Sequence, residues 1–191
     1  MLRIDKYLAD CGIGTRSEVK KYIKNKLVTV NGTVISKSDM KVNEGEDIVC
    51  FRNKELHYEK YVYYLFHKPA GCVTAKQDNL HKTVLDYFPE GIPMDVSPVG
   101  RLDLDTEGLL LLTNDGPLAH HLLSPTHHIP KTYIAILDKD VPLNAIELFK
   151  SGVDIGDDKL CLPAELHILS PREATLTIHE GRFHQVKRMF E

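Results

Sequence analysis

Strand-like segments outnumber helical ones in this sequence, and the two kinds do not alternate regularly. Apolar stretches of strand length occur at residues 28–30, 33–35, 47–51, 61–66, 108–113, 132–137, 164–169 and 174–178. Helical patterns are expected at residues 3–10, 15–23, 83–88, 118–123, 142–150 and 184–190. A doubly wound sheet needs regular βα alternation, so we predict an α+β fold with a mixed, mainly antiparallel sheet.

The composition is that of an ordinary soluble protein. The 191 residues are 42% hydrophobic, which is enough to bury a core in one or two domains. The sequence contains neither a stretch of about 18 apolar residues nor an apolar leader, so we expect a cytoplasmic protein that enters no membrane. The four cysteines are far apart and form no CxxC pair. We therefore expect buried, reduced thiols rather than disulfides or a zinc ribbon.

Two helices and a small sheet are predicted near the N-terminus. Glycines separate the two helices, and Thr15 with Glu18 fits the capping box that starts the second one. The pair Asn31-Gly32 tolerates the positive backbone angles of a tight hairpin between two short β-branched strands.

Positive charge is concentrated in this N-terminal part, although the whole chain has a net charge of −3. Residues 1–26 contain seven lysines and arginines and three acidic residues, which gives a local charge of +4. Such a patch is the usual electrostatic footprint of a phosphate-binding surface. On charge alone, a solvated helix face explains it equally well.

The segments LRIDKYLA, TRSEVKKYIKNKLVTVNG and VNEGEDI resemble the RNA-binding module named after the fourth protein of the small ribosomal subunit. The resemblance implies phosphate contacts by Arg3, Arg16, Lys20, Lys21 and Lys24. Such contacts position a protein without reading sequence. We expect the module at residues 1–56, a polar linker at 52–60 and a second domain at 57–191.

An acidic loop precedes the most apolar predicted strand. The sequence GRLDLDTEG places one arginine and three acids between two glycines at residues 100–108. Loops at a sheet edge commonly display catalytic groups, and this spacing alone is compatible with acid–base catalysis, a magnesium site or a polar turn. Three alternating acids lack the further ligands that would make a metal site specific.

Four motifs occur in order between Tyr64 and Phe190: HKPAGCVT, GRLDLDTEGLLLLTNDG, SPTHHIPKTY and EGRFHQVKRMF. They resemble the motifs of RsuA-type pseudouridine synthases, which modify small-subunit ribosomal RNA. The resemblance implies isomerisation of a uridine to pseudouridine, which needs no redox change or group transfer and hence no cofactor. Relatives of the same architecture that modify large-subunit rRNA are the nearest alternative.

The resemblance also implies which residues form the active site. Asp103 matches the family's essential aspartate and would be the nucleophile. Tyr133 matches the tyrosine that lies against the target base, and Lys187 the basic residue that pairs with the catalytic carboxylate, with Arg188 as the alternative. Arg101 would fill the gap left by the flipped uridine or form an ion pair with a neighbouring acid.

Other features are assigned structural or RNA-facing roles. Residues 68–71 follow a predicted strand and are expected to shape the wall of the cleft. The histidines at residues 120–128 have no cysteine or acidic ligand at suitable spacing, so no metal site is predicted there. Without the resemblance, Tyr133 would be interpreted as a core tyrosine of its strand.

The sequence therefore predicts a monomeric enzyme that modifies one uridine of small-subunit rRNA, with rRNA or an assembling ribosomal subunit as its partner. Alternatives from other classes are a non-catalytic rRNA-binding or ribosome-assembly factor and a generic carboxylate hydrolase. Because the chain ends within what resembles the helix of the last motif, we expect a C-terminally truncated catalytic domain.

Overall fold

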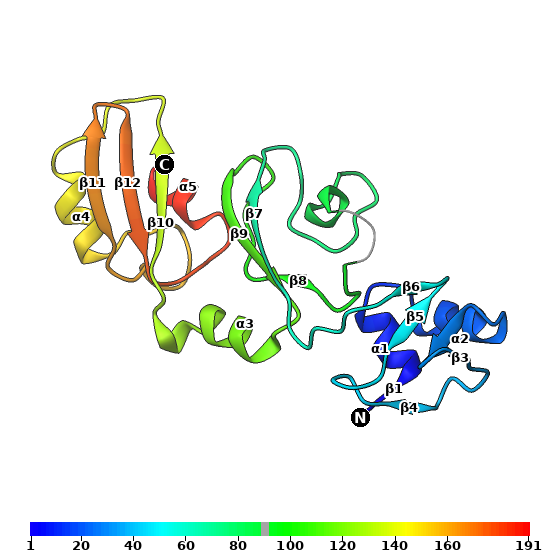
Figure 1. Cartoon of the computed structure of the whole chain (residues 1–191). Helices are drawn as coiled ribbons and strands as arrows, with labels where there is room; N and C mark the ends of the chain where they lie inside the picture. The colour runs from blue at the N-terminus through cyan, green and yellow to red at the C-terminus, as the bar shows by residue number, and fades with distance from the viewer. Residues whose placement is uncertain (89–91) are drawn as a thin grey trace. The chain divides into compact units, whose positions relative to one another are not determined.

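The computed structural model describes residues 1–88 and 92–191. The chain divides into two units, Met1–Ala119 and His120–Glu191, whose relative position is not determined, and each unit is described by itself (Figure 1). The paired strands of both units run antiparallel. This confirms the predicted α+β class with mainly antiparallel sheets.

Two short helices begin the first unit, α1 (Ile4–Asp10) and α2 (Arg16–Lys24). The predicted capping box is present at the start of α2. The Glu18 backbone N–H donates to the Thr15 hydroxyl oxygen at 3.3 Å, and the Thr15 backbone N–H donates to the Glu18 carboxylate at 2.8 Å. These bonds satisfy amides that no helical carbonyl reaches, and they fix where α2 begins.

A four-stranded sheet follows in the order β3-β2-β5-β6. Its strands are β2 (Val28–Val30), β3 (Thr33–Val34), β5 (Val49–Phe51) and β6 (Lys54–Glu55). Asn31 and Gly32 have φ angles of 50° and 76°, which confirms the predicted hairpin turn. A separate antiparallel pair is formed by β1 (Leu2–Arg3) and β4 (Lys41–Val42).

The segment predicted as a polar linker is partly folded onto the core of this module. The ring of Tyr58 stacks on Tyr7 with 5.2 Å between the ring centroids, and the Tyr7 hydroxyl donates to the Leu56 carbonyl at 3.2 Å. Leu56 and Tyr58 thereby pack against the buried side chains of α1, α2, β2 and β5. The prediction was wrong here because scattered apolar residues in a polar stretch show no period.

A three-stranded sheet in the order β7-β9-β8 occupies the later part of the first unit. Its strands are β7 (Tyr63–Lys68), β8 (Ser97–Pro98) and β9 (Gly108–Thr113). One face packs Phe66, Leu110 and Leu112 against Val84 of a short 3₁₀-helix, Val84–Tyr87. The acidic loop at residues 100–107 therefore leads directly into a strand that has one face buried in this core.

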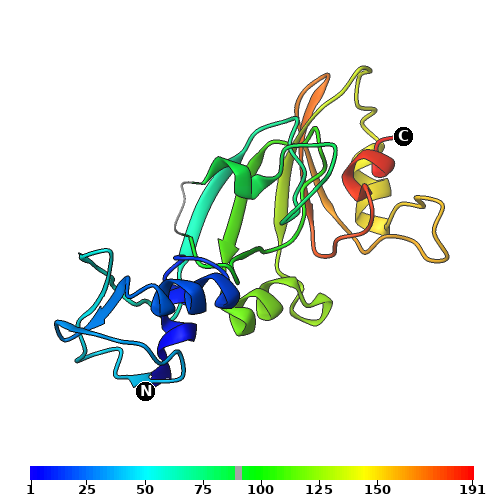
Figure 2. The same ribbon diagram turned by 90° about the vertical axis from the view of Figure 1, so that its right-hand side faces the viewer.

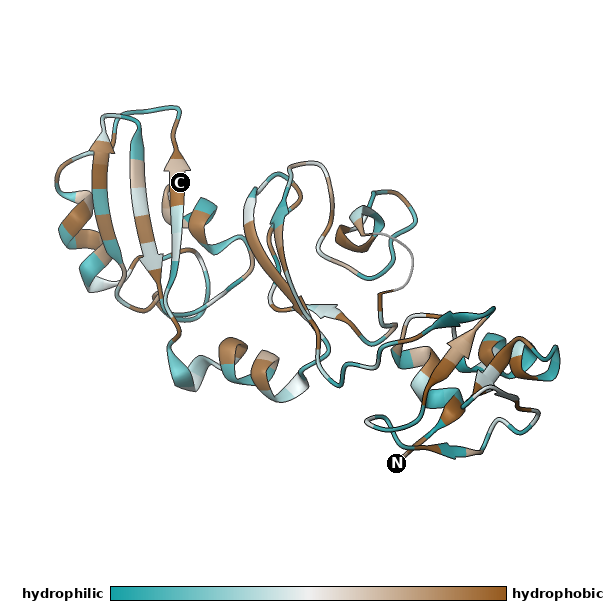
Figure 3. Ribbon diagram, in the orientation of Figure 1, coloured by the Kyte–Doolittle hydropathy of each residue, from teal (hydrophilic) through white to brown (hydrophobic). Residues whose placement is uncertain are grey.

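The helix α3 (Gly116–Leu123) crosses the boundary between the units, and a 3₁₀ turn follows at Pro125–His127. The second unit contains β10 (Lys131–Ile136), β11 (Glu165–Ser170) and β12 (Glu173–Ile178), in the order β10-β12-β11. Hydrophilic and hydrophobic residues alternate along most of β11 (Figure 3). Accordingly, α4 (Ala145–Ser151) and α5 (Gln185–Met189) cover only one face of this sheet (Figure 2).

Each helix among the described residues is too short or too polar to cross a bilayer. The four cysteines are free thiols; Cys72 and Cys161 are buried, whereas Cys11 and Cys50 are half-buried.

Candidate functional site

The acidic loop is built around a buried lysine. Lys68 lies at the end of β7 and its side chain is fully buried. Its ammonium group donates to the backbone carbonyls of Asp103 at 2.9 Å and Thr106 at 2.8 Å, and more weakly to those of Pro69 at 3.1 Å and Leu104 at 3.3 Å. A lysine is rarely buried without such partners, because desolvation of an unpaired ammonium is costly.

A second set of bonds holds the start of the same loop. The Thr74 hydroxyl donates to the Leu102 carbonyl at 2.7 Å and accepts from the Leu102 N–H at 3.1 Å. The Gly71 N–H donates to the Leu104 carbonyl at 2.8 Å. Residues 68–74 therefore fix the backbone of residues 102–106 from the core side, and sequence reasoning did not predict these contacts.

The side chains of the loop differ in exposure. Asp103 is half-buried, whereas Arg101, Asp105 and Glu107 are exposed. A carboxylate on a fixed backbone needs little rearrangement to meet a substrate atom, which is the property required of a nucleophile. Arg101 is exposed on the same loop.

The second unit carries Tyr133 and Lys187. Tyr133 lies on β10 and packs, half-buried, against the core on the face of the sheet that α4 and α5 cover. Lys187 is exposed on α5, and its neighbour Val186 packs against the same core. The structure thus brings Tyr133 and the helix of Lys187 to one face of one sheet. Asp103 belongs to the other unit, so its pairing with Lys187 stays a prediction.

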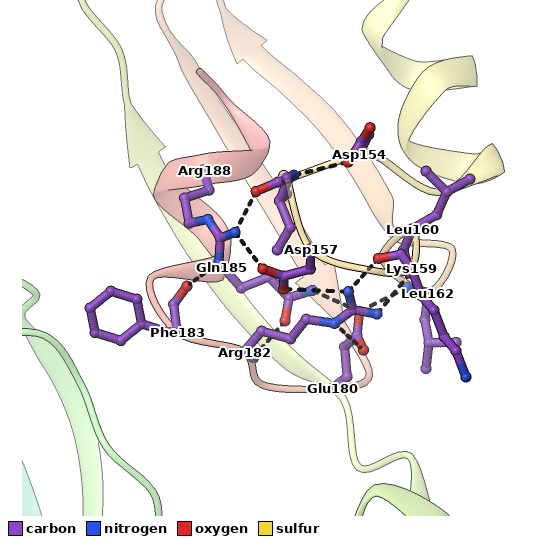
Figure 4. A network of polar contacts seen from close by, with 12 residues as sticks. Asp154, Asp157, Lys159, Leu160, Leu162, Glu180, Arg182, Phe183, Gln185 and Arg188 are labelled. Carbon is purple, nitrogen blue, oxygen red and sulfur yellow. Dashed lines mark hydrogen bonds and ion pairs between the residues drawn. The ribbon is translucent and has the colours of Figure 1, made fainter.

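An ionic network holds the turn before α5 (Figure 4). Asp157 accepts from the Arg188 guanidinium at 2.6 Å and lies 3.6 Å from that of Arg182. The hydrogen bond and charge of Arg188 hold the pKa of Asp157 below its usual value, against a smaller opposing effect of burial. Arg188 also donates to the carbonyls of Ile155 and Phe183.

The same network extends through Arg182. Its guanidinium donates to the carbonyls of Lys159 at 2.6 Å and Leu160 at 2.7 Å, and to the Glu180 carboxylate at 3.1 Å. The turn before α5 is thereby tied to the loop that follows α4. The guanidinium of Arg188 binds Asp157 and two backbone carbonyls of its own unit. Arg188 is therefore a poorer candidate than Lys187 for pairing with a catalytic aspartate.

The histidines contact one another and the backbone. The rings of His121 and His127 lie 4.1 Å apart, and Nδ1 of His127 is 2.9 Å from the His121 carbonyl. Nδ1 of His179 is 2.9 Å from the His128 carbonyl. Within residues 1–88 and 92–191, no three His, Cys, Asp or Glu side chains are grouped so that they could hold a metal ion.

The predicted phosphate-binding residues of the N-terminal module are exposed: Arg3, Arg16, Lys20, Lys21 and Lys24. Arg3 also has a partner within the module. Its guanidinium donates two hydrogen bonds, of 3.1 and 3.0 Å, to the carboxylate of the buried Asp5. Burial raises the pKa of Asp5, but the hydrogen bonds and charge of Arg3 outweigh it, so the pKa is lower than usual.

Comparison with known protein families decides the class of this chain. The model of the RNA pseudouridylate synthase family matches residues 62–191, and that of the S4 domain matches residues 2–48. The chain belongs to the RNA pseudouridylate synthase family. It is thus an isomerase of RNA uridine with an N-terminal S4 RNA-binding domain, which confirms both resemblances predicted from the sequence.

Individual relatives of this synthase cover nearly the whole chain. The ribosomal small subunit pseudouridine synthase A of Vibrio cholerae serotype O1 is 38% identical over 99% of this chain and 82% of its own length. The ribosomal large subunit pseudouridine synthase B of Bacillus subtilis is 39% identical over 100% of this chain and 80% of its own length. A crystal structure of a pseudouridylate synthase superposes with a TM-score of 0.66 at 37% identity, covering 100% of this chain and 82% of that one.

Proposed function

We propose that this synthase isomerises one specific uridine of small-subunit ribosomal RNA and that Asp103 is the nucleophile. We choose Asp103 because of its place in the acidic loop. Asp103 is half-buried and its backbone carbonyl accepts a hydrogen bond from the buried Lys68, whereas Asp105 is exposed. The small-subunit target is supported by the relatedness to ribosomal small subunit pseudouridine synthase A.

The reaction moves one bond of the nucleoside. The bond between the ribose C1′ and N1 of uracil breaks, the base rotates, and C1′ bonds to C5; the C5 proton leaves and N1 gains a proton, so the atoms balance without a cofactor. The Asp103 carboxylate assists either by adding covalently to the nucleoside or by promoting removal of a ribose proton to give a glycal.

The remaining site residues support this carboxylate and the base. We assign Tyr133 to the surface on which the uracil ring lies, where its hydroxyl helps to remove the C5 proton. Lys187 is assigned to pair with Asp103, which keeps the acid ionised and oriented. Arg101 is assigned to the space that the uridine leaves when it swings out of its stack.

The two parts of the chain divide the work in this proposal. Residues 57–191 perform the chemistry, and the protein acts as a monomer. Residues 1–56 bind the folded RNA through phosphate contacts of five basic residues: Arg3, Arg16, Lys20, Lys21 and Lys24. The first part supplies affinity that is independent of sequence. The choice of uridine then depends on the second part and on the shape of the RNA, free or within an assembling subunit.

Large-subunit rRNA is the second candidate target, because the Bacillus subtilis relative that is 39% identical is named for it. Unmodified transcripts of both rRNAs should be incubated with the protein, and pseudouridine mapped by carbodiimide treatment and primer extension. We expect one stop in the small-subunit transcript that Asp103→Asn abolishes. A single stop in the large-subunit transcript would establish the second candidate, and binding without any stop would leave a non-catalytic rRNA-binding factor.

A further inference from the structure

The turn between β12 and α5 presents an aromatic ring to solvent. The Phe183 side chain is 76% exposed. It points away from the ionic network around Asp157, whereas its carbonyl accepts a hydrogen bond of 3.0 Å from Arg188 (Figure 4). The backbone of Phe183 is thus fixed from one side while its ring remains accessible from the other.

A second ring lies against this one. The rings of Phe183 and His184 are stacked, with 3.8 Å between centroids and 19° between planes. Single exposed apolar side chains are common on proteins and need no explanation. Phe183 differs because one face of its ring is occupied by His184, its backbone is held by Arg188, and Lys187 lies in the first turn of the helix α5 that follows.

The size and chemistry of this surface fit a nucleobase. A protein partner needs roughly 800 Å² of surface on each side, far more than one ring supplies. A base needs only one flat apolar face, and stacking on aromatic side chains is the usual way in which proteins hold unstacked RNA bases. When a uridine leaves its helix, the bases beside it lose a stacking partner and become available to such a ring.

We propose that Phe183, backed by His184, is a stacking platform for a nucleotide next to the target uridine. This inference rests on the proposed rRNA substrate. Phe183 contributes affinity through its ring face alone, so its contribution does not depend on salt. Arg188, which is itself bound to Asp157, holds the backbone from which the ring projects.

The test compares Phe183→Ala, Phe183→Leu and Phe183→Tyr with the wild type in equilibrium binding to the two unmodified rRNA transcripts. Alanine should weaken binding by about 5- to 150-fold, the range found for loss of one base–aromatic stack. Leucine should weaken it similarly, because it is apolar but has no ring, and tyrosine should restore affinity. Leu143→Ala, at a side chain that is 83% exposed in the same unit, is the matched control and should bind as the wild type does.

Salt dependence separates this surface from the basic N-terminal module. Phe183→Ala should lower affinity equally at all salt concentrations and leave the slope of log affinity against log salt unchanged, because no counterion is released by stacking. Wild-type affinity of the alanine variant, or an equal loss in the Leu143 control, would overturn the platform. If neither the wild type nor any variant forms pseudouridine in either transcript, but Phe183→Ala still weakens RNA binding, the proposed enzymatic target is overturned and the platform is not.

Discussion

The ammonium group of Lys68 donates a hydrogen bond of 2.9 Å to the backbone carbonyl of Asp103. A fully buried lysine therefore contacts the backbone of the residue that we propose as the nucleophile. The same ammonium group also donates to the carbonyls of Leu104 and Thr106, and these bonds together fix the backbone of the loop.

Lys68→Met tests that dependence. Methionine fills a similar volume but donates no hydrogen bond. The carbonyls of Asp103, Leu104 and Thr106 therefore each lose the ammonium group, and those of Asp103 and Leu104 keep only one backbone N–H donor each. We expect the free energy of unfolding to fall by about 2–4 kcal/mol in urea denaturation. Single-turnover conversion should fall more than RNA affinity does. Lys76→Met, at an exposed lysine with one bond of 3.3 Å to Met94, should change stability by less than about 0.5 kcal/mol; equal effects of the two changes would contradict the role of Lys68.

Asp103→Asn tests the nucleophile. The amide is nearly isosteric with the carboxylate, so fold and RNA affinity should be kept while single-turnover conversion is lost. Asp105→Asn is the control and should have a mild effect. If Asp103→Asn keeps more than about a tenth of the activity, a loss under about 1.4 kcal/mol in the barrier, the assignment is wrong.

The three lysines of α2 provide a test of the RNA-binding module. If Lys20, Lys21 and Lys24 neutralise phosphates, changing all three to alanine should weaken RNA binding and lower the slope of log affinity against log salt by about 2 to 3 units. Conversion at saturating RNA should stay near the wild-type rate. The same change at three exposed lysines of the second unit, Lys139, Lys150 and Lys159, is the matched control. An unchanged slope in the α2 variant would show that these lysines form only a solvated face.

Asp5 predicts a pH dependence of stability. Its pKa is lower in the folded protein than in the unfolded chain, where it is about 4. The ion pair with Arg3 therefore stabilises the fold fully above about pH 4, and that stabilisation is lost as the pH falls through the lowered folded-state pKa. Urea denaturation between pH 7 and pH 3 should show this loss in the wild type and a weaker one in Asp5→Asn. Glu46→Gln, at an exposed carboxylate, should leave the wild-type dependence in place.

Much of the fold follows from local signals in the sequence. The Thr15–Glu18 capping box fixes the start of α2, Asn31-Gly32 fixes a hairpin, and the apolar run at residues 108–113 is β9 to the residue. The two-residue strands β1 and β4 could not be predicted, because a period of two needs more than two residues to be recognised.

The candidate site was less predictable. Asp103, Tyr133 and Lys187 were identified only by resemblance to a family, since spacing alone left a polar turn and a core tyrosine as alternatives. Sequence reasoning expected a structural role for residues 68–71 but not a fully buried Lys68, because lysine is among the residues least often buried. Asp157 was missed entirely, because its partners Arg182 and Arg188 lie more than twenty residues away in the chain.

The carbonyl oxygens around Lys68 form the kind of cage in which hard ions such as magnesium or calcium are bound, but the cation here is tethered to the chain. A tethered cation cannot be removed by a chelator or lost on dilution. We therefore expect the conformation of the loop that carries Asp103 not to depend on the concentration of divalent ions. Where conversion varies with magnesium, we expect the variation to reflect the folding of the RNA rather than of the enzyme.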